Sequence, residues 1–500
     1  MFKKVLTLSS GSAIGKLFGI VREVLFAAFF GTSAVADAYR AAMTATITPI
    51  HLLTSETLSS TFIPQFRIDR KNNNSMAWAL FNGIGSLTVF FSLIIGCGIY
   101  FFASTWAALL FPGFAENQFN LTVQMLKIMA WGVPLYSISA LLISLEIGSG
   151  RFALAASRAF VQNIGIIIAI LLAVWTRNPV WIAWGFTGTY IVFAFWGTAC
   201  VIRKGLLERN WFSHWKRVKD AFNRCWPSIK PLFLFSLFNQ VNILLEKAIA
   251  SLIGPGSVAA VEYARLIPET SQVLLIVPLG LVSLSSMSTF QEQEVREHSD
   301  RISSMVILLL VPLSCFILIS APDIIRLLYS RGTFDETSIY LTSMTLRGMS
   351  IGMWAVSLAY VFQKIFNARI RNREVLQIGA AGIITNALFN VMTYKYLGIL
   401  AIGLGSSLGG IITLWLYIRK MGSLKNFVQM GRICLFGLLP YCIIGLLIES
   451  SYDWTPLNRL LVQLLWAIIS WSIVFRAFPS SRNTLKYLFE KLASLRSENR

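Results

Sequence analysis

Apolar runs long enough to cross a membrane recur along the whole chain. Three examples are VFFSLIIGCGIYFFA (89–103), NIGIIIAILLAVW (163–175) and SMVILLLVPLSCFILI (304–319). With their flanks, each reaches the roughly 18 residues that a ~30 Å hydrocarbon core requires. Only 13% of the 500 residues are charged and 55% are hydrophobic, whereas a soluble domain is about a quarter charged. We therefore predict an all-α polytopic membrane protein.

About fourteen spans can be placed on the sequence. Their expected limits are 8–31, 34–62, 76–103, 121–146, 153–175, 180–202, 229–253, 257–289, 303–328, 337–366, 375–394, 398–418, 433–449 and 458–478. Lys and Arg collect in the loops and tails on one side, which the positive-inside rule assigns to the cytoplasm. We expect both termini there, in a multi-pass membrane protein. The first apolar stretch is long, charged and without a small-residue cleavage pattern, so we expect no cleaved signal peptide.

The formal net charge of +20 follows from the same rule. No soluble segment is large enough to carry a nucleic-acid recognition surface, so we expect no nucleic-acid partner. The six cysteines are scattered through apolar runs without CxxC pairs or zinc spacing, and we expect them to be packing residues and not metal ligands. Residues 203–230 alternate bases with aromatic residues, which is typical of an amphipathic helix in the headgroup layer.

Short matches recur in the same order in the two halves of the chain. SAVADAYR (33–40) parallels SVAAVEYAR (257–265), and LKIMAWGVPLYS (126–137) parallels LRGMSIGMWAVS (346–357). We infer two pseudo-symmetric six-helix lobes with the same topology. The expected division is an N-terminal lobe (1–204), a cytoplasmic amphipathic linker (205–230), a C-terminal lobe (231–420), two appended spans (421–478) and a basic cytoplasmic tail (479–500).

Charges lie deep in the first span, GKLFGIVREVLFAAFFG (15–31). At 1.5 Å per residue, Arg22 lies ~20 Å from Ser9 and ~13 Å from Gly31, too deep to reach the interface by snorkelling. An intramembrane charge costs at least ~2.5 kcal/mol and normally faces a bundle interior or a water-filled cavity. Lys16 shares a face with Glu23. Lys16 and Arg22 are candidate ligands for an anion, and Glu23 is either a functional group or one member of a buried ion pair.

Further charges form pairs with helical spacing. Asp37 and Arg40, and likewise Glu262 and Arg265, are three residues apart and can pair on one helix face, as structural salt bridges or as gates. Basic groups of both lobes, Lys16, Arg22, Arg265 and Arg347, could converge on one cavity. His51, which follows Pro49, is a further candidate for substrate binding. Such a cavity would suit phosphate oxygens.

Enzyme signatures are poor. The chain has no Walker A sequence, no HExxH and no plausible nucleophile triad. GLGSSLGG (403–410) lies inside an apolar span and is better explained by small-residue helix packing. The predictions are therefore a transporter, no enzyme activity, no cofactor and no metal site.

The chain resembles, over nearly its whole length, the MurJ (MviN) lipid II flippase family of the multidrug/oligosaccharidyl-lipid/polysaccharide exporter superfamily, and the first 65 residues carry the most specific part of the resemblance. The resemblance rests on FGIVREVLFAAFFGTSAVADAY, on ETLSSTFIPQF and on EYARLIPE further along the chain. It implies a two-lobed transporter of the bacterial inner membrane that works by alternating access on a polyprenyl-pyrophosphate-linked glycan. The last two spans would correspond to the helices that form the family's groove for the lipid tail.

Residue by residue, Arg22 and Arg265 match basic residues of the family. Glu23 occupies a position where the family usually has Asp, and Asp37 and Glu56 match acidic positions of the family. The chain departs from the pattern at Lys16, which replaces an arginine, and at His51, which falls where a basic residue is expected. Asn386 and Asn390 are neutral where some members hold sodium with carboxylates.

Four functions are considered, in decreasing order of support. We expect a lipid II flippase, with cell-wall or polysaccharide synthesis enzymes as possible partners. A flippase for an exopolysaccharide or O-antigen unit is the alternative. A cation-coupled drug or metabolite exporter is less favoured, because the deep charges are basic. A glycan-transferring membrane enzyme ranks last, because the expected outer loops are short and nearly free of carboxylates.

Overall fold

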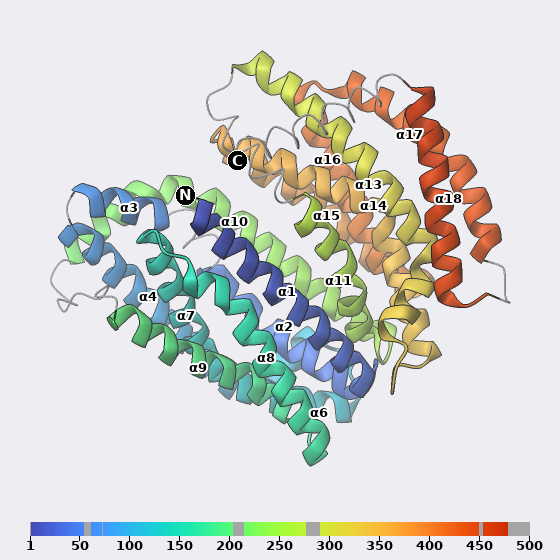
Figure 1. The fold of residues 1–500 in the computed structure, drawn as a ribbon. Helices are drawn as coiled ribbons and strands as arrows, with labels where there is room; N and C mark the ends of the chain where they lie inside the picture. The colour runs from blue at the N-terminus through green and yellow to red at the C-terminus, as the bar shows by residue number, and fades with distance from the viewer. Residues whose placement is uncertain are drawn as a thin grey trace. The chain divides into compact units, whose positions relative to one another are not determined.

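The protein is described by a computed structural model that covers residues 2–54, 62–72, 74–203, 215–276, 291–449 and 454–478. The described chain is helical and contains no strand (Figure 1). The helices of the first half are α1 (Phe2–Phe30), α2 (Ala34–Thr54), α3 (Ile63–Asn72), α4 (Asn74–Phe101), α5 (Ala103–Leu110), α6 (Glu116–Ala130), α7 (Gly132–Gly148), α8 (Ala153–Thr176), α9 (Trp181–Arg203) and α10 (Trp215–Ile253).

The second half contains α11 (Ser257–Leu275), α13 (Glu292–Tyr329), α14 (Glu336–Ala368), α15 (Asn372–Leu397), α16 (Leu400–Met421), α17 (Leu424–Glu449) and α18 (Pro456–Ala477). By contacts, the chain divides into two compact units. The first unit is Met1–Ala259 with Arg331–Phe334, and the second is Ala260–Ser330 with Asp335–Arg500. The lobe, linker and tail boundaries expected from the sequence stay a prediction. Residues 204–214 and 479–500 lie outside the described residues.

Many of the helices are transmembrane in length and composition. Ten described helices are long and apolar enough to span a membrane, or eleven if the bent pair α6 and α7 is one span. A polytopic membrane fold is therefore confirmed, whereas the expected count of fourteen spans is not. The helix α1 is not among these helices. It carries Lys16, Arg22 and Glu23, and these charges lower the mean apolarity by which a span is recognised.

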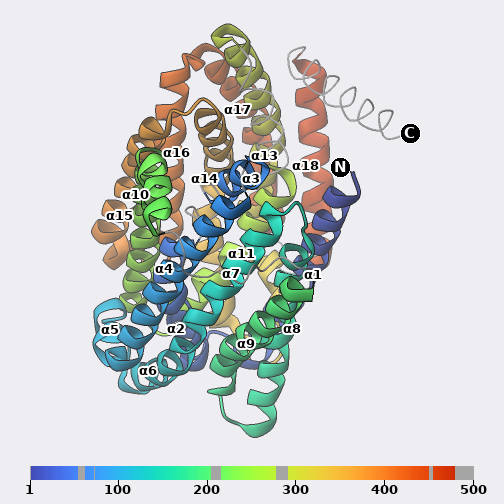
Figure 2. The same cartoon turned by 90° about the vertical axis from the view of Figure 1, so that its left-hand side faces the viewer.

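Within each unit, the helices pack in the same pattern. In the first unit α8 packs on α9, α7 packs on α9, and α4 packs on α7 (Figure 2). In the second unit α15 packs on α16, α14 packs on α16, and α13 packs on α14. The helices α17 and α18 pack on each other and on α13, outside this pattern, as expected for appended spans.

Hydrogen bonds between helices repeat at a constant separation in sequence. The Thr187 hydroxyl donates to the Ile128 carbonyl (2.9 Å), and the Ser407 hydroxyl donates to the Gly348 carbonyl (2.6 Å). Both donors and both acceptors are 220 residues apart (407 − 187 and 348 − 128). This separation equals that of the matching stretches 126–137 and 346–357, so the packing supports the predicted internal repeat.

The loop that follows α7 and the loop that follows α14 have the same turn geometry. The Arg151 amide donates to the Glu146 carbonyl (2.9 Å), and the Arg371 amide donates to the Phe366 carbonyl (2.9 Å). The residue before each arginine has a positive φ, 76° at Gly150 and 59° at Ile370. Glycine adopts this left-handed conformation at little cost, whereas a β-branched residue there is a genuine outlier. The repeat therefore contains one relaxed copy of the turn and one strained copy.

Candidate functional site

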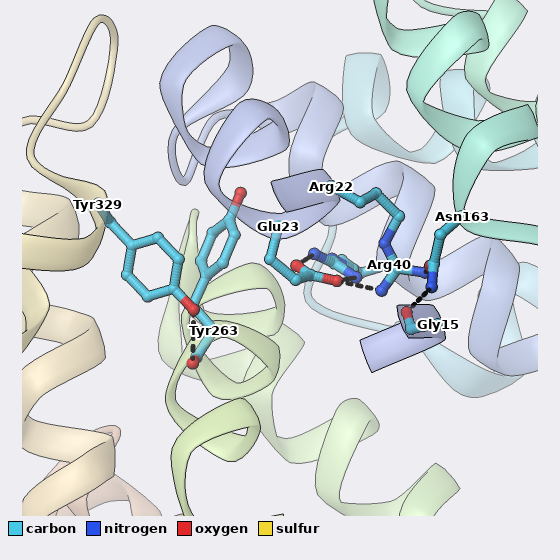
Figure 3. A network of polar contacts seen from close by, with 7 residues as sticks. All are labelled: Gly15, Arg22, Glu23, Arg40, Asn163, Tyr263 and Tyr329. Atoms are coloured by element: carbon cyan, nitrogen blue, oxygen red, sulfur yellow. Dashed lines mark hydrogen bonds and ion pairs between the residues drawn. The ribbon is translucent and has the colours of Figure 1, made fainter. Parts of the chain in front are cut away.

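A buried carboxylate on α1 lies between two guanidinium groups. Glu23 is 4% exposed and forms ion pairs with its neighbour Arg22 and with Arg40 of α2 (Figure 3). Arg40 contacts both carboxylate oxygens, and its Nη1 donates to Glu23 Oε1 at 3.3 Å. Its guanidinium also lies 4.7 Å from the centre of the Phe26 ring, a cation–π distance. Two arginines and one glutamate leave this triad with a net charge of +1.

Arg22 has a second partner on α8. Its Nη1 donates to Asn163 Oδ1 at 2.9 Å, and the Asn163 amide donates in turn to the Gly15 carbonyl at 2.8 Å (Figure 3). A Cβ at Gly15 would lie 2.6 Å from the Ala159 Cβ, so the small residue permits the close approach of α1 and α8. The Arg22 side chain stays 18% exposed. Its guanidinium is therefore oriented by two neighbours while part of its surface remains accessible to an anion.

The expected pairing of Asp37 with Arg40 is wrong. Arg40 pairs with Glu23 across the α1–α2 hairpin. Asp37, which is fully buried, accepts hydrogen bonds from the amides of Gly256 (2.6 Å) and Ala259 (2.8 Å) and from the Gln118 side chain (3.1 Å). Those two amides belong to the start of α11, and a helix N-terminus is a favourable place for a carboxylate. The (i, i+3) spacing allowed the pair, but tertiary partners satisfied both groups differently.

His51 belongs to a cluster of aromatic and basic side chains. Its Nε2 lies 2.9 Å from the Tyr136 hydroxyl, and Arg158 of α8 lies over the Tyr136 ring at 4.7 Å from the centroid. Tyr190 packs against Tyr136 with ring centres 4.9 Å apart. His51 and Arg158 are both partly buried. A cation of α8 thus lies beside the α2 position where the family resemblance led us to expect one.

The remaining predicted site residues are distributed as follows. Lys16 is partly buried on α1. Glu262 and Arg265 are partly buried on α11, in the second unit, so the convergence of Arg265 with Arg22 stays a prediction. Glu56 lies outside the described residues.

Two polar contacts of the second unit join neutral groups. The buried Asn390 donates to Asn386 at 2.8 Å on α15, and the Tyr329 hydroxyl donates to the Tyr263 carbonyl at 3.4 Å (Figure 3). The described residues contain no group of three or more His, Cys, Asp or Glu that could hold a metal ion.

Asn163, Tyr136 and Arg158 were not among the predicted site residues. A charge in an otherwise apolar stretch was the available signal for Arg158, by the argument already applied to Arg22. Asn163 and Tyr136 are polar residues of ordinary frequency in spans. Only the tertiary structure shows that they hold Arg22 and His51.

The arrangement in the first unit can bind and orient an anion. It offers cations oriented by carboxylate, amide and aromatic neighbours, in a chain whose sequence has no nucleophile triad or Walker A sequence. This chemistry is suited to non-covalent recognition of phosphate groups.

Comparisons with known proteins identify relatives over most of the chain. A family model described as lipid II flippase MurJ matches residues 26–455. The chain is 23% identical to a probable lipid II flippase MurJ of Rhizobium tropici, over 91% of this chain and 88% of the relative. It is also 23% identical to a lipid II flippase MurJ of Burkholderia cenocepacia, over 92% of this chain and 93% of the relative.

Solved structures share the fold. A lipid II flippase MurJ in an inward closed conformation matches with a TM-score of 0.80 and 20% identity, over 95% of this chain and 99% of that one. An inward-facing multidrug resistance MATE family transporter of the MOP superfamily matches with a TM-score of 0.68 and 13% identity, over 82% of this chain and 96% of that one. At these identities the likeness shows the fold. The family model covers most of the chain, and the chain therefore belongs to the lipid II flippase MurJ family, a family of transporters in the bacterial inner membrane.

Proposed function

We propose that this chain moves lipid II, a polyprenyl-pyrophosphate-linked glycan, from the cytoplasmic to the outer leaflet of the inner membrane by alternating access. Both termini would lie in the cytoplasm, as the distribution of Lys and Arg indicates. The observation that carries the proposal is the Arg22 guanidinium, which is oriented by Glu23 and Asn163 and remains partly exposed. Enzymes that make the precursor and enzymes that polymerise it would act on either side of the membrane.

Arg22 would hold the pyrophosphate. A guanidinium carries five N–H donors in a planar fork that matches phosphate oxygens. Glu23 and Asn163 each accept from one terminal nitrogen of Arg22, so the side chain is oriented before the substrate arrives. Because Glu23 balances only one of its two arginines, the triad keeps a net positive charge. Preorganisation of this kind lowers the entropic cost of binding.

Arg158 would supply a second cation in the same unit. His51 stands where the family resemblance leads us to expect a basic residue, and Tyr136 contacts both His51 and Arg158. We propose that Arg158 takes over the electrostatic role at this position and that His51 acts as a hydrogen-bonding group. Lys16 would contribute a point charge two turns from Glu23 on α1. Arg265 would contribute from the second unit.

The test combines export and folding. The Arg22→Ala variant should fail to support growth of a strain depleted of its own lipid II flippase, and Arg22→Lys should restore part of the function, because it keeps the charge but loses the fork. Arg203→Ala removes an exposed base at the end of α9 and serves as the charge-matched control. Membrane abundance and unfolding temperature should be measured for all three variants.

A folded and abundant Arg22→Ala protein that supports growth like the wild type would contradict the proposal. To test the substrate, the same strains should be assayed for lipid II accessible at the outer leaflet. Growth rescue without a change in accessible lipid II would assign the chain to a different lipid-linked glycan.

A further inference from the structure

A large polar cavity lies at one end of the second unit. It has a volume of about 930 Å³ and is formed by the start of α13, the turn between α14 and α15, and the end of α16. Its lining includes four basic side chains, Arg296, Arg369, Arg371 and Lys420, and two acidic ones, Glu297 and Asp300. The lining therefore has a net charge of +2, which favours an anionic ligand.

Several of the bases are held in place. Arg371 donates to both carboxylate oxygens of Glu374, at 2.6 and 2.8 Å, and its guanidinium lies 4.4 Å from the centre of the Phe366 ring. Lys420 Nζ lies 3.5 Å from Oε2 of the same carboxylate. Arg296 donates to the Gly422 carbonyl. The cations are thus arranged by neighbours before any ligand binds.

The strained turn lies at the edge of this cavity. Ile370, between Arg369 and Arg371, has a φ of 59° and a side chain that is 81% exposed. The same turn in the first unit has Gly150 at this position. Glycine adopts this conformation without strain, so the turn does not require a strained residue. A backbone outlier is a reason to look for function. An exposed isoleucine contributes no packing within the protein that would offset its strain.

Insertion into the membrane explains only part of this arrangement. Basic residues at span ends are expected on the cytoplasmic side, and that rule alone accounts for Arg369, Arg371 and Lys420. It does not require an isoleucine in a left-handed conformation. A connection of three residues joins α14, which ends at Ala368, to α15, which begins at Asn372. Ile370 is the middle residue of this connection between two spans, and we expect it on the headgroup side of the hydrocarbon core. An apolar side chain among arginines suits this layer.

We propose that this cavity binds the phosphate of an anionic membrane lipid, with Ile370 inserted among the acyl chains beside it. The bound group would be a phosphodiester, contacted by Arg296 and Arg369 at the cavity wall. The binding is separate from transport and requires only that the second unit be embedded in a membrane. A free phosphate compound shares the charge but has no acyl chain for Ile370 to contact.

Lipid titration of the purified full-length protein in a neutral detergent tests the proposal. Thermal unfolding should be followed while short-chain phosphatidylglycerol, phosphatidylcholine or inorganic pyrophosphate is added. Phosphatidylglycerol should raise the unfolding temperature saturably, and the rise should weaken with salt. Phosphatidylcholine should not raise it. Pyrophosphate should bind more weakly than phosphatidylglycerol, because it makes no acyl contact.

Variants separate the charge from the apolar contact. The Arg296→Gln/Arg369→Gln double variant should weaken the apparent affinity for phosphatidylglycerol by roughly tenfold or more, since each base near a lipid surface contributes measurably. The Ile370→Gly variant should weaken the affinity for the lipid but not for pyrophosphate, and without lipid it should unfold at the same or a higher temperature. The control is Arg203→Gln/Lys395→Gln, which removes two exposed bases elsewhere.

Three outcomes would overturn the proposal. An equal response to phosphatidylcholine would show a non-specific detergent or lipid effect. Equal losses in the cavity variant and the control would show a response to net charge alone. Tight pyrophosphate binding together with an unaffected Ile370→Gly variant would assign the cavity to a soluble anion. None of these measurements depends on transport, so their failure and the failure of the proposed flippase function can be told apart.

Discussion

The two repeats are built on the same packing pattern but place different polar groups inside it. In the first unit, α1, α2 and α8 bring together a buried glutamate, two arginines and an asparagine. In the second, two contacts inside the packing of α14, α15 and α16 join neutral groups: Ser407 is bonded to the Gly348 carbonyl and Asn390 to Asn386. The charges of Arg371, Glu374 and Lys420 lie at the ends of these helices. The buried charges of the first unit cost desolvation free energy, and the anion-binding role that we propose would account for them.

The largest expected effect comes from removing the central carboxylate. Glu23→Ala removes the carboxylate that pairs with the buried Arg40, and breaking a buried ion pair from one side costs about 3–5 kcal/mol. Unfolding of the purified protein in detergent would measure the loss. The Glu23→Gln/Arg40→Met double variant should recover part of it, because the buried Arg40 charge is removed together with the carboxylate and only the partly exposed Arg22 keeps its charge. If Glu23→Ala unfolds like the wild type, the triad is not a stabilising contact.

A smaller effect is expected from the repeated hydrogen bond. Ser407 also accepts from the Gly352 amide at 2.7 Å, whereas Thr187 makes the single bond to Ile128. Ser407→Ala should therefore destabilise the protein more than Thr187→Val, with each lost hydrogen bond contributing about 0.5–1.5 kcal/mol. Equal losses in the same unfolding assay would contradict this ranking.

The two copies of the turn should respond with opposite signs. Gly150→Ala places a side chain at a φ of 76° and should destabilise the protein by about 1–2 kcal/mol. Ile370→Gly removes a side chain at a φ of 59°, and the relieved strain should outweigh the added freedom of the unfolded chain. Both are measured in lipid-free detergent. Destabilisation by Ile370→Gly there would show that Ile370 packs within the protein.

The smallest effect concerns the residues that precede α6 and α14 at their N-terminal caps. Asp335 caps α14, accepting from the Ser338 amide at 2.9 Å and from its hydroxyl at 2.7 Å, whereas the corresponding Ala115 of α6 offers no side-chain cap. The Ser338 amide lowers the pKa of Asp335 below its usual value. The stability that Asp335 contributes is therefore fully present above the pKa of this carboxyl in the unfolded chain. It is lost as the pH falls through the lower pKa of the folded protein.

Asp335→Ala should cost at most about 1 kcal/mol and should remove this part of the acid dependence. Unfolding temperatures between pH 3 and pH 7 would measure it. Ala115→Asp is the reciprocal change and should add a cap with the same pH dependence. An unchanged pH profile for Asp335→Ala would show that the cap does not contribute to stability.

Sequence features that depend on local length were predicted well. The span expected at 153–175 is observed as Ala153–Thr176, and the one expected at 180–202 is observed as Trp181–Arg203, because an apolar run defines its own limits. The depth of Arg22 followed from counting residues. The partners of Glu23 and Arg22 could not be predicted in this way, because Glu23 and Arg40 are 17 residues apart and Arg22 and Asn163 are 141 residues apart. Helical spacing describes neighbours on one helix and contains no information about which helices meet.

The position of Asp37 has a consequence for the synthesis of the protein. Two of its three hydrogen-bond donors are the amides of Gly256 and Ala259, which follow it by 219 and 222 residues. At about 5–20 residues per second, a ribosome needs roughly 10–40 s to make that interval. During this time α2 already carries a carboxylate whose final amide partners do not exist. The first unit can therefore complete the hydrogen bonds of Asp37 only after residue 259 has been made.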